Sequence, residues 1–290
     1  MGWAIDAINK RVSVRTYSDQ PIEDERKQKI LDLLSSENKG VHGNRVRFEL
    51  IDLSEAERDE VKSLGTYGFI KGAKMYIAGA VNGGPGAMED VGYCFEKVIL
   101  GVTNLGLGTC WLGGTFKRAS FARKMSVSQS EVVPAISPIG YAADNRTIRE
   151  RALRRLARSD QRKPWGEMFF DGDVNVPLTK ESAGGYAVAL ECLRLGPSAS
   201  NNQPWRVVYH REQGAFHFYL RRTPGYDRLN RAIDLQRLDM GIAMCHFELA
   251  ALESGLAGSW QTGQPDLHAG DLEYTVKWIA PRQTKTVEQM

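Results

Sequence analysis

Two stretches of this chain repeat each other without a gap. Residues 90–111 read DVGYCFEKVILGVTNLGLGTCW, and residues 239–260 read DMGIAMCHFELAALESGLAGSW. At a constant offset, the identical pairs are Asp90 and Asp239, Gly92 and Gly241, Leu100 and Leu249, Gly106 and Gly255, Leu107 and Leu256, and Trp111 and Trp260. Self-similarity at a fixed spacing is the signature of an internal duplication, so the sequence predicts two related halves.

Each repeated stretch reads as a helix that is apolar around most of its circumference. Such helices are buried in soluble proteins, so we expect these two to form the centre of the fold. The sequences Gly-Leu-Gly from Gly106 and Gly-Leu-Ala-Gly from Gly255 are typical of glycine C-caps. Two unrelated core helices of similar composition are the alternative that the residues leave open.

The segments before the two helices also correspond, although more loosely. Residues 30–53 and 188–212 each read as helix, loop and strand. The loop of the first copy reads SENKGVHGNR, whereas that of the second reads GPSASNNQPW and is rich in hydroxyls and amides. The sequence therefore predicts a first repeat at residues 1–160, a second and shorter repeat at residues 161–281, and a polar tail at residues 282–290.

Runs rich in β-branched and aromatic residues predict strands between the helices. These runs are FELIDL (48–53), KMYIAGAV (74–81), VVPAISPIGYA (132–142), WRVVYH (205–210), AFHFYLRR (215–222) and LEYTVKWIA (272–280). Helices and strands mix without a regular βαβ alternation. This favours an α+β fold with mixed, mostly antiparallel sheets flanked by helices over a doubly wound fold.

Composition places the chain among ordinary soluble globular proteins, with 42% hydrophobic residues and a net charge of +3. Scattered cysteines without a Cys-x-x-Cys pair predict reduced thiols. No apolar run approaches the roughly 18 residues that span a bilayer, and the N-terminus lacks a signal-peptide core. The basic arm at residues 146–163 has no interleaved aromatics. We therefore expect a cytoplasmic protein with no membrane or nucleic-acid partner.

The segment RVSVRTY near the N-terminus carries two arginines and a serine at alternating positions. In an extended strand, Arg11, Ser13 and Arg15 point to one side. Guanidinium groups bind phosphate oxygens in a paired geometry, so this face predicts a site for a phosphate monoester. A basic strand that pairs with nearby acids such as Asp19 or Glu23 fits the motif equally well.

Three motifs together resemble the flavin-dependent nitroreductase family, and within it the single-chain tandem-repeat branch. They are RVSVRTY, the loop pattern Pro-Ser-x-x-Asn-x-Gln-Pro-Trp, and a buried helix that ends in Gly-Leu-Gly and is followed by Trp-Leu-Gly-Gly. The resemblance covers roughly residues 8–165 as one complete copy and residues 180–280 as a degenerate one.

In ordinary family members two short chains form a dimer, and each FMN is held by the arginine motif of one protomer and the Pro-Ser loop of the other. Here the arginine motif lies in the first copy and the Pro-Ser loop in the second. The resemblance therefore implies a nitroreductase-like fold in which one polypeptide forms a pseudo-dimer around two buried central helices. The reciprocal half-site has decayed, which implies one FMN per chain.

The resemblance also implies a set of cofactor-binding residues from both copies. They are Arg11, Val12, Ser13, Arg15, Trp111, Leu112, Gly113, Gly114, Arg162, Lys163, Pro197, Ser198, Ala199, Ser200, Asn201 and Gln203. The arginine motif and the later basic pair would meet the FMN phosphate. The Pro-Ser loop would lie against the ribityl chain and the ring edge, and its asparagine and glutamine would shape the loop.

The resemblance places the backbone of Leu112, Gly113 and Gly114 at the reactive face of the flavin, where a backbone N–H can hydrogen-bond flavin N5. The two glycines permit this close approach. Ordinary members often carry a glutamate where this chain has Gly113, so recognition of nicotinamide through that side chain has no counterpart here. Lys71 or Lys74 is the candidate substitute for the family's missing contacts to the flavin pyrimidine.

The activity that the resemblance implies is FMN-dependent reduction of nitroaromatic or quinone-like small molecules, with NADH or NADPH as donor and ping-pong kinetics. The cofactor carries the reaction through N5, so we expect no catalytic side chain and no metal. Dehalogenation, ene reduction, flavin breakdown and a non-catalytic flavin carrier or sensor are the alternatives. We expect a monomer, as a pseudo-dimer, or a weak homodimer.

Other features point away from competing functions. NLGLGTCW begins like a dinucleotide fingerprint, but it follows a helix and Trp111 replaces the third glycine, which argues against a Rossmann fold. The histidines never pair at metal-ligand spacing, and His246 in an apolar helix is expected to be a core residue with satisfied hydrogen bonds. Cys110 is expected to be a small buried hydrophobe.

Overall fold

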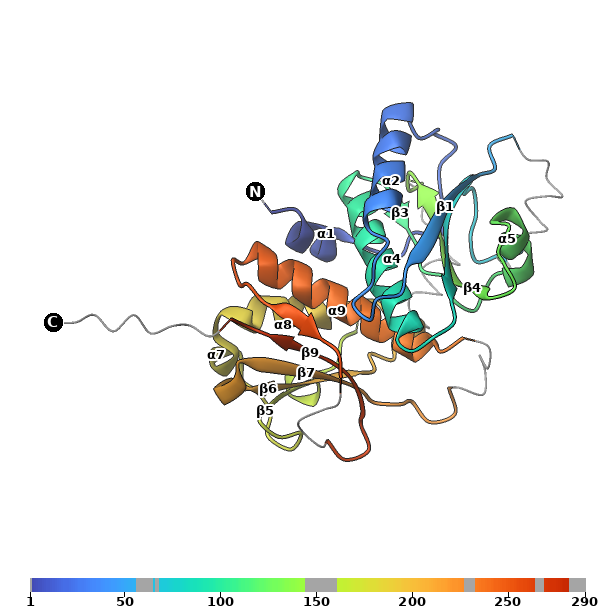
Figure 1. Cartoon of the computed structure of the whole chain (residues 1–290). Helices are drawn as coiled ribbons and strands as arrows, with labels where there is room; N and C mark the ends of the chain where they lie inside the picture. The colour runs from blue at the N-terminus through green and yellow to red at the C-terminus, as the bar shows by residue number, and fades with distance from the viewer. Residues whose placement is uncertain are drawn as a thin grey trace.

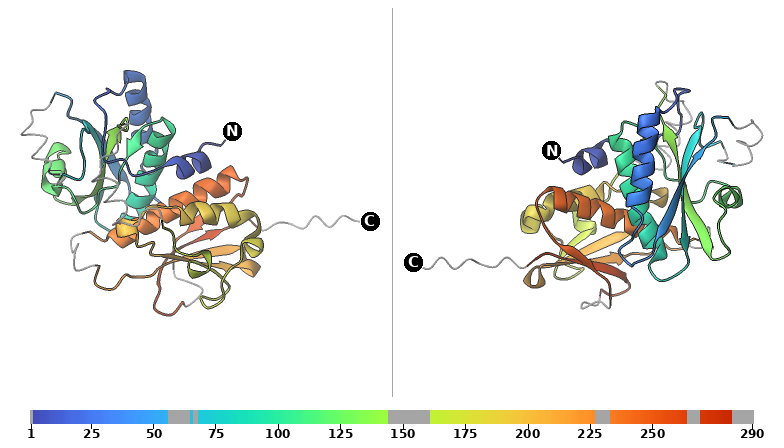
Figure 2. Two further views of the ribbon diagram at one scale, coloured as in Figure 1. Left: turned by 180° about the vertical axis from the view of Figure 1, so that it is seen from behind. Right: turned by 45° about the horizontal axis from the view of Figure 1, so that its top comes forward.

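The computed structural model of the chain describes residues 2–55, 65, 68–143, 161–226, 233–263 and 269–281. It contains one β-sheet in each half of the chain, and helices α4 (Ala87–Asn104) and α9 (Leu235–Glu253) cross between the two sheets (Figure 1). Two further views show that the first sheet lies beside α4 and the second beside α9 (Figure 2). Helices and sheets are combined in an α+β architecture, as predicted.

The first half holds a four-stranded antiparallel sheet in the order β1-β2-β4-β3. Its elements along the chain are α1 (Ala4–Lys10), α2 (Asp24–Ser36), β1 (Val46–Asp52), β2 (Met75–Asn82), α4, β3 (Gly108–Thr109), α5 (Arg118–Lys124) and β4 (Glu131–Gly140). Successive side chains of a strand point to opposite faces. Along β2, Ile77 therefore enters the core around α4, whereas Tyr76 packs against Phe121 of α5.

The second half holds a five-stranded sheet in the order β5-β6-β7-β9-β8. Its elements are β5 (Phe169–Asp171), α7 (Lys180–Ala183), α8 (Ala187–Arg194), β6 (Trp205–His210), β7 (Ala215–Leu220), α9, β8 (Ser259–Gln261) and β9 (Glu273–Ile279), with a short 3-10 turn at Ala199–Asn201. β5 pairs with β6 in parallel, and the other pairings of this sheet are antiparallel.

The structure confirms the predicted fold class. Each of the six predicted strands is present, with ends that differ by a residue or two. β3, β5 and β8 were not predicted, because two or three residues carry no readable alternation. Residues 146–160 of the basic arm and the tail at 282–290 lie outside the described residues, and the expected boundaries of the repeats stay a prediction.

The remaining general expectations concern thiols and membranes. The four cysteines form no disulfide and are buried, and Cys110 is only 2% exposed. Among the described residues, no helix combines the length and the apolar character that crossing a bilayer requires.

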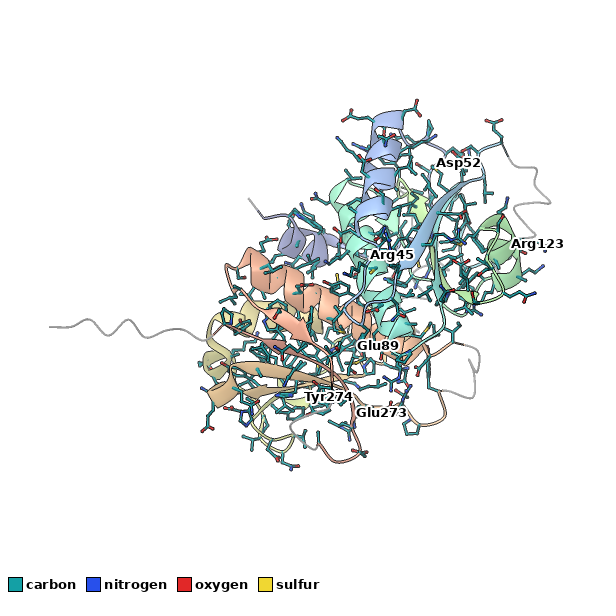
Figure 3. The ribbon with its side chains drawn as sticks, viewed as in Figure 1. Arg45, Asp52, Glu89, Arg123, Glu273 and Tyr274 are labelled. Atoms are coloured by element: carbon teal, nitrogen blue, oxygen red, sulfur yellow. The ribbon has the colours of Figure 1, made fainter. Side chains whose placement is uncertain are left out.

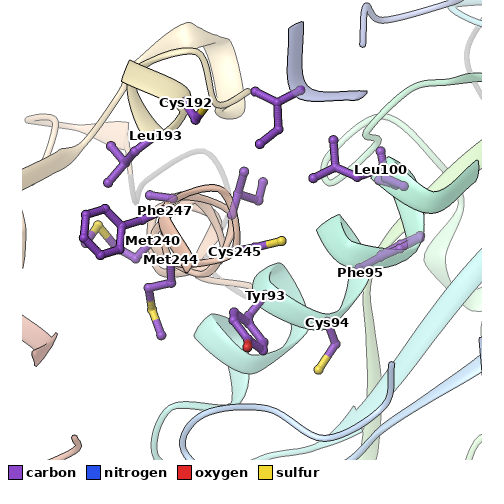
Figure 4. Packing of buried hydrophobic residues seen from close by; sticks show 14 of the residues in the cluster. Tyr93, Cys94, Phe95, Leu100, Cys192, Leu193, Met240, Met244, Cys245 and Phe247 are labelled. Atoms are coloured by element: carbon purple, nitrogen blue, oxygen red, sulfur yellow. The ribbon is translucent and has the colours of Figure 1, made fainter. Parts of the chain in front are cut away.

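Helices α4 and α9 are buried on nearly all sides, as their composition predicted. Figure 4 shows this core at close range, with Phe95 and Leu100 on α4 and Met244, Cys245 and Phe247 on α9. The apolar surface is continuous across the two helices, so one core joins the two halves of the chain.

Two glycines set how closely the helices approach. A Cβ atom added at Gly92 of α4 would lie 2.0 Å from the carbonyl oxygen of Leu238, and one added at Gly241 of α9 would lie 1.9 Å from the carbonyl oxygen of Glu89. Both distances are far inside van der Waals contact, and both involve backbone atoms. The helices therefore touch backbone to backbone at a point where only glycine fits.

These contacts are reciprocal. Gly92 matches Gly241 in the repeat, and Glu89 matches Leu238 at the same offset. Gly92 contacts Leu238 and Gly241 contacts Glu89, so the two contacts are the same contact made once from each helix. Reciprocity of this kind characterises a twofold interface between like units. It supports the duplication that we infer from the sequence.

The ends of the two helices are also alike. Gly106 (φ 82°) follows α4 and Gly255 (φ 75°) follows α9, both in the left-handed region. The N–H of Leu107 donates to Val102 and the N–H of Leu256 donates to Ala251, which is the same spacing at both helix ends. This is the Schellman C-cap that the glycine pattern predicted.

Replacing either crossing glycine will destabilise the protein. In Gly92→Ala and Gly241→Ala the new methyl group meets a backbone carbonyl that cannot move without separating the helices, so we expect a loss of about 3 kcal/mol or more in the free energy of unfolding. Chemical denaturation measures it. Gly83→Ala is the control, because a Cβ at Gly83 meets nothing within 4 Å. Equal stability of all three variants would contradict the close crossing.

Candidate functional site

A cavity of about 380 Å³ opens between the two halves of the chain. Its lining residues from the first half are Trp111, Gly113, Gly114, Thr115 and Ala135, and those from the second half are Pro197, Ser198, Ala199, Ser200, Tyr226, Leu235, Leu238, Asp239 and Ile242. The structure thus brings the Trp-Leu-Gly-Gly segment and the Pro-Ser loop, which are far apart in the sequence, to one cavity. α9 closes it between them with apolar side chains.

The first-half wall is made by the chain just after β3. Leu112 exchanges backbone hydrogen bonds with Ile136 at 2.9 and 3.0 Å and is itself buried, so it holds the wall without lining the cavity. At Gly113 a Cβ would lie 2.6 Å from Cδ2 of Leu235. The side chain of Leu235, from the second half, therefore occupies the space that the Cβ atom of any larger residue at position 113 would need.

The Pro-Ser loop has a strained backbone. Ser200 (φ 52°), Asn201 (φ 56°) and Gln203 (φ 48°) all lie in the left-handed region, which non-glycine residues seldom adopt. The hydroxyl of Ser198 accepts the N–H of Gln203 at 2.9 Å, and the buried Gln203 amide donates to the backbone oxygen of Asn201 at 3.2 Å. Strain of this kind persists only where surrounding contacts enforce it, and it concentrates at binding sites.

Asp239 ties this loop to α9. Its two carboxylate oxygens lie 3.0 and 3.1 Å from the backbone N of Ala199, which donates to them. Burial raises the pKa of Asp239 well above its usual value. Asp90, its match in the repeat, accepts the backbone N–H groups of His42 at 2.8 Å and Asn44 at 2.9 Å. Each aspartate therefore anchors the loop of its own half onto a central helix.

The arginine motif lies next to the same wall but does not line the cavity. Ser13 pairs in parallel with Thr109 of β3, and the N–H of Val14 donates to the oxygen of Thr109 at 2.8 Å. The segment is extended at this point, as predicted. Val12 is 37% exposed.

The acids offered as alternative partners of the motif are engaged elsewhere. Asp19 pairs with Lys74 at 3.4 Å, and Glu23 pairs with Arg26 at 3.6 Å. Within the described parts of the chain, Nη1 of Arg15 is buried without a hydrogen-bond partner, and so are Nε and Nη1 of Arg11.

A buried polar network connects Arg11 to the cavity wall. Nε of Arg11 lies 3.8 Å from Oε1 of Glu96, and Oε2 of Glu96 accepts the indole N–H of Trp111 at 2.5 Å. Nε2 of His246 lies 2.8 Å from Oε1 of Glu96, and Nδ1 of His246 lies 2.8 Å from the oxygen of Cys192. His246 is thus a core residue with both ring nitrogens satisfied.

The proton count of this network follows from its geometry. A carbonyl oxygen only accepts, so Nδ1 of His246 must donate to Cys192. The contact between Nε2 and Glu96 then needs a second proton, which makes the pair either imidazolium with carboxylate or imidazole with carboxylic acid. Both forms have no net charge, so the positive charge of Arg11 is not cancelled by the pair.

The later basic pair braces the Pro-Ser loop. Arg162 donates to the oxygen of Leu195 at 3.0 Å, and the backbone N–H of Lys163 donates to the side-chain oxygen of Gln203 at 2.8 Å. Burial, with Arg206 nearby, lowers the pKa of Lys163 to about 8. Arg162, Lys163, Asn201 and Gln203 do not line the cavity, and their contact with a cofactor stays a prediction.

The two lysines proposed for the flavin pyrimidine differ in position. The backbone of Lys71 pairs with the arginine motif, because its N–H donates to the oxygen of Arg15 at 2.9 Å and its oxygen accepts the N–H of Tyr17 at 2.9 Å. Lys74 instead pairs with Asp19 beside a different cavity. Neither lysine lines the cavity, and a contact of either with the flavin stays a prediction.

Sequence reasoning missed part of the cavity. Leu238, Asp239 and Ile242 come from the first turns of α9, and Tyr226 places its hydroxyl 3.4 Å from that of Ser200. Asp239 carried a signal, since it is one of the identical pairs of the repeat. Tyr226 carried none, because a single tyrosine before a helix has no pattern.

Comparison with known proteins gives matches over most of the chain. Residues 4–251 match the protein family described as "Putative TM nitroreductase". A protein of Methanothermobacter thermautotrophicus named "Putative NADH dehydrogenase/NAD(P)H nitroreductase" is 26% identical over 155 residues, which are 50% of this chain and 81% of that protein.

One solved structure shows the same fold over nearly the whole chain. A crystal structure from Thermotoga maritima, titled as a putative nitroreductase, covers 96% of this chain and 94% of its own with 22% identity and a TM-score of 0.59. A structure titled as an FMN-dependent nitroreductase of Clostridium difficile covers 49% of this chain and 90% of its own, with 22% identity and a TM-score of 0.41. The fold of the Thermotoga protein extends over both halves of this chain.

The two matched aspartates will respond differently to neutralisation. The raised pKa of Asp239 means that the folded state disfavours the charged carboxylate. The wild type therefore loses stability relative to Asp239→Asn as the pH rises from the pKa of this aspartate in the unfolded chain to its pKa in the folded chain. We expect Asp239→Asn to gain on the wild type steadily between acid and neutral pH, because an asparagine oxygen can still accept the N–H of Ala199. Denaturant titrations across this range measure the difference.

Asp90→Asn serves as the matched control. Both carboxylate oxygens of Asp90 accept backbone N–H groups. In Asp90→Asn the side-chain amide nitrogen replaces one of these oxygens, so its N–H groups face a backbone N–H and one hydrogen bond is lost. We expect a loss of about 1–3 kcal/mol at neutral pH. A pH-independent difference between Asp239→Asn and the wild type would contradict the burial of a titrating carboxyl group.

Proposed function

Because the chain belongs to the family described as "Putative TM nitroreductase", we propose that it is an FMN-dependent oxidoreductase that uses NADH or NADPH to reduce nitroaromatic or quinone-like molecules. The observation that carries the proposal is the shared cavity. Gly113 and Gly114 of the first half face Pro197, Ser198 and Ser200 of the second half across it. The relative from Methanothermobacter, whose name includes NAD(P)H, supports the nicotinamide donor.

The residues present fit FMN. A volume of about 380 Å³ lies within the range of small-molecule and cofactor sites. Gly113 and Gly114 add no side chains of their own to this part of the wall, which suits close approach of a flat ring. Guanidinium nitrogens of Arg11 and Arg15 that have no hydrogen-bond partner among the described residues are buried donors, and they carry positive charge of the kind that binds a phosphate group, although Nε of Arg11 also lies 3.8 Å from Glu96.

The chain's own residues bind and orient the cofactor in this proposal. The arginine motif holds the phosphate, the glycine wall receives the ring, and the Pro-Ser loop covers the opposite edge. Asp239 and the Ser198 hydroxyl keep that loop in its strained conformation. Leu238 and Ile242 give the cavity an apolar side that excludes water. Bound FMN would supply the redox chemistry, which is transfer of two electrons from nicotinamide to the acceptor.

The equivalent position in the other half carries paired charged side chains. At the offset of the repeat, Leu238 of the cavity corresponds to Glu89, and Arg237 bridges Glu89 at 2.7 Å and Glu273 at 2.6 Å. Figure 3 labels these two acids, one from each half of the chain. His42 of the first-copy loop packs where a Cβ at Gly86 would lie, so this loop covers the start of α4. Charged and ordered contacts fill the second position, and we expect one FMN per chain.

Loss of Arg15 should weaken FMN and spare riboflavin. A charge-assisted hydrogen bond is worth about 1.5–3 kcal/mol, so we expect Arg15→Ala to bind FMN about 10- to 100-fold more weakly. Riboflavin lacks the phosphate and should lose much less. Titration with both ligands, followed by flavin fluorescence, measures the two changes. Arg45→Ala, which removes an exposed arginine of the first half, is the control. Equal losses for FMN and riboflavin would refute the phosphate assignment.

Anaerobic reduction tests the activity itself. We expect the FMN-loaded protein to bleach with NADH or NADPH much faster than free FMN does, and a quinone or nitroaromatic compound to restore the yellow colour. A yellow protein that neither nicotinamide bleaches would favour a flavin carrier. A protein that cannot be loaded with FMN would overturn the proposal.

A further inference from the structure

Arg118, the first residue of α5, contacts the wall of the cavity from behind. Its Nη2 donates to the oxygen of Gly113 at 2.7 Å and to that of Pro134 at 3.3 Å, and its Nε donates to the oxygen of Val133 at 2.8 Å. Gly113 is a lining residue of the cavity, but Arg118 is not. The guanidinium group thus ties the glycine wall to strand β4 without entering the cavity.

This contact orients the next N–H group. A trans peptide is planar, so the carbonyl of one residue and the N–H of the next point in opposite directions. The described chain has no cis peptide bond. With the Gly113 oxygen turned toward Arg118, the N–H of Gly114 points the other way, toward the cavity that Gly114 lines.

Among the described residues, none accepts a hydrogen bond from the N–H of Gly114. Gly114 is exposed where it lines the cavity, so its N–H is open to solvent or to a ligand. An unpaired N–H at the wall of a cavity is suited to a ligand atom that accepts a hydrogen bond. Arg118 is the residue that fixes its direction.

Arg118 also brings a positive charge to the wall. In the described part of the chain it has no carboxylate partner: it contacts the three carbonyl oxygens, and its guanidinium carbon lies 5.0 Å from the centre of the Phe116 ring. Burial lowers the pKa of Arg118, yet a guanidinium stays protonated in proteins. A charge in partly buried surroundings acts more strongly than in water. It polarises the Gly113–Gly114 peptide and strengthens the Gly114 N–H as a donor.

We propose that Arg118 is a positioning residue of the cofactor site: it holds the Gly114 N–H toward flavin N5, and its charge favours the reduced cofactor over the oxidised one. The inference rests on the proposed function. With FMN bound, hydride transfer from nicotinamide would bring two electrons and one proton and would leave the nicotinamide oxidised, so the flavin ring system would gain one negative charge. The positive charge of Arg118 behind the wall would stabilise that gain, whereas the oriented N–H would hold the oxidised ring at its N5 acceptor.

A purely structural role for Arg118 makes a different prediction. If the side chain only braced the wall against β4, its loss would lower stability and flavin affinity but leave the midpoint potential of bound FMN unchanged. The potential therefore separates the two roles. Arg123 of the same helix is exposed and provides a matched control for loss of an arginine from α5 (Figure 3).

The experiment compares the FMN-loaded wild type with Arg118→Gln, Arg118→Lys and Arg123→Gln by anaerobic redox titration. We expect Arg118→Gln to bind reduced FMN about tenfold more weakly relative to oxidised FMN, which lowers the midpoint potential by about 30 mV for a two-electron couple. Arg118→Lys keeps the charge but cannot hold the carbonyls as a fork, so a smaller shift in the same direction is expected. Arg123→Gln should match the wild type.

The outcomes separate this inference from the proposed function. A wild type that binds no FMN overturns both. A wild type that binds FMN, with a folded Arg118→Gln of unchanged potential, overturns only the role of Arg118. If Arg118→Gln does not fold, Arg118→Lys decides, and an unchanged potential in that variant contradicts the proposal.

Discussion

The backbone contact between α4 and α9 at Gly92 and Gly241 holds the rest of the structure in place. Each helix covers the sheet of its own half, so the crossing fixes one sheet relative to the other. It also fixes the cavity, because one wall follows β3 in the first half and the opposite wall is anchored to α9 through Asp239. A larger residue at the crossing would move the two walls apart as well as weaken the core.

Around this crossing the two halves keep matched contacts but differ in what those contacts support. Asp90 and Asp239 both anchor a loop, and the same glycine caps end both helices. Leu238 lines the cavity with an apolar side chain. At the position that matches Leu238 in the repeat, Glu89 forms an ion pair with Arg237 instead. An apolar residue replaced by a charged one must find a partner, and the partner then occupies the room that a ligand would need.

Much of the fold could be predicted from sequence, because it depends on local patterns. The apolar repeat predicted the buried helix pair, and runs rich in β-branched and aromatic residues, such as WRVVYH, predicted the longer strands. The site was harder, since cavity walls meet only in the folded chain. Gly113, Gly114 and the Pro-Ser loop could be named from motifs, whereas Tyr226 and Leu235 depend on where α9 begins. Arg118 acts through a carbonyl contact across a turn, which no spacing of residue types reveals.

The most direct measurement is a crystal structure of the chain grown with FMN. We predict that the flavin ring lies between Gly113–Gly114 and Pro197–Ser200, with the phosphate within hydrogen-bond distance of Arg11 or Arg15. This arrangement would show one cofactor held by both halves at once. FMN bound by residues of one half alone, or in a different cavity, would contradict the shared site.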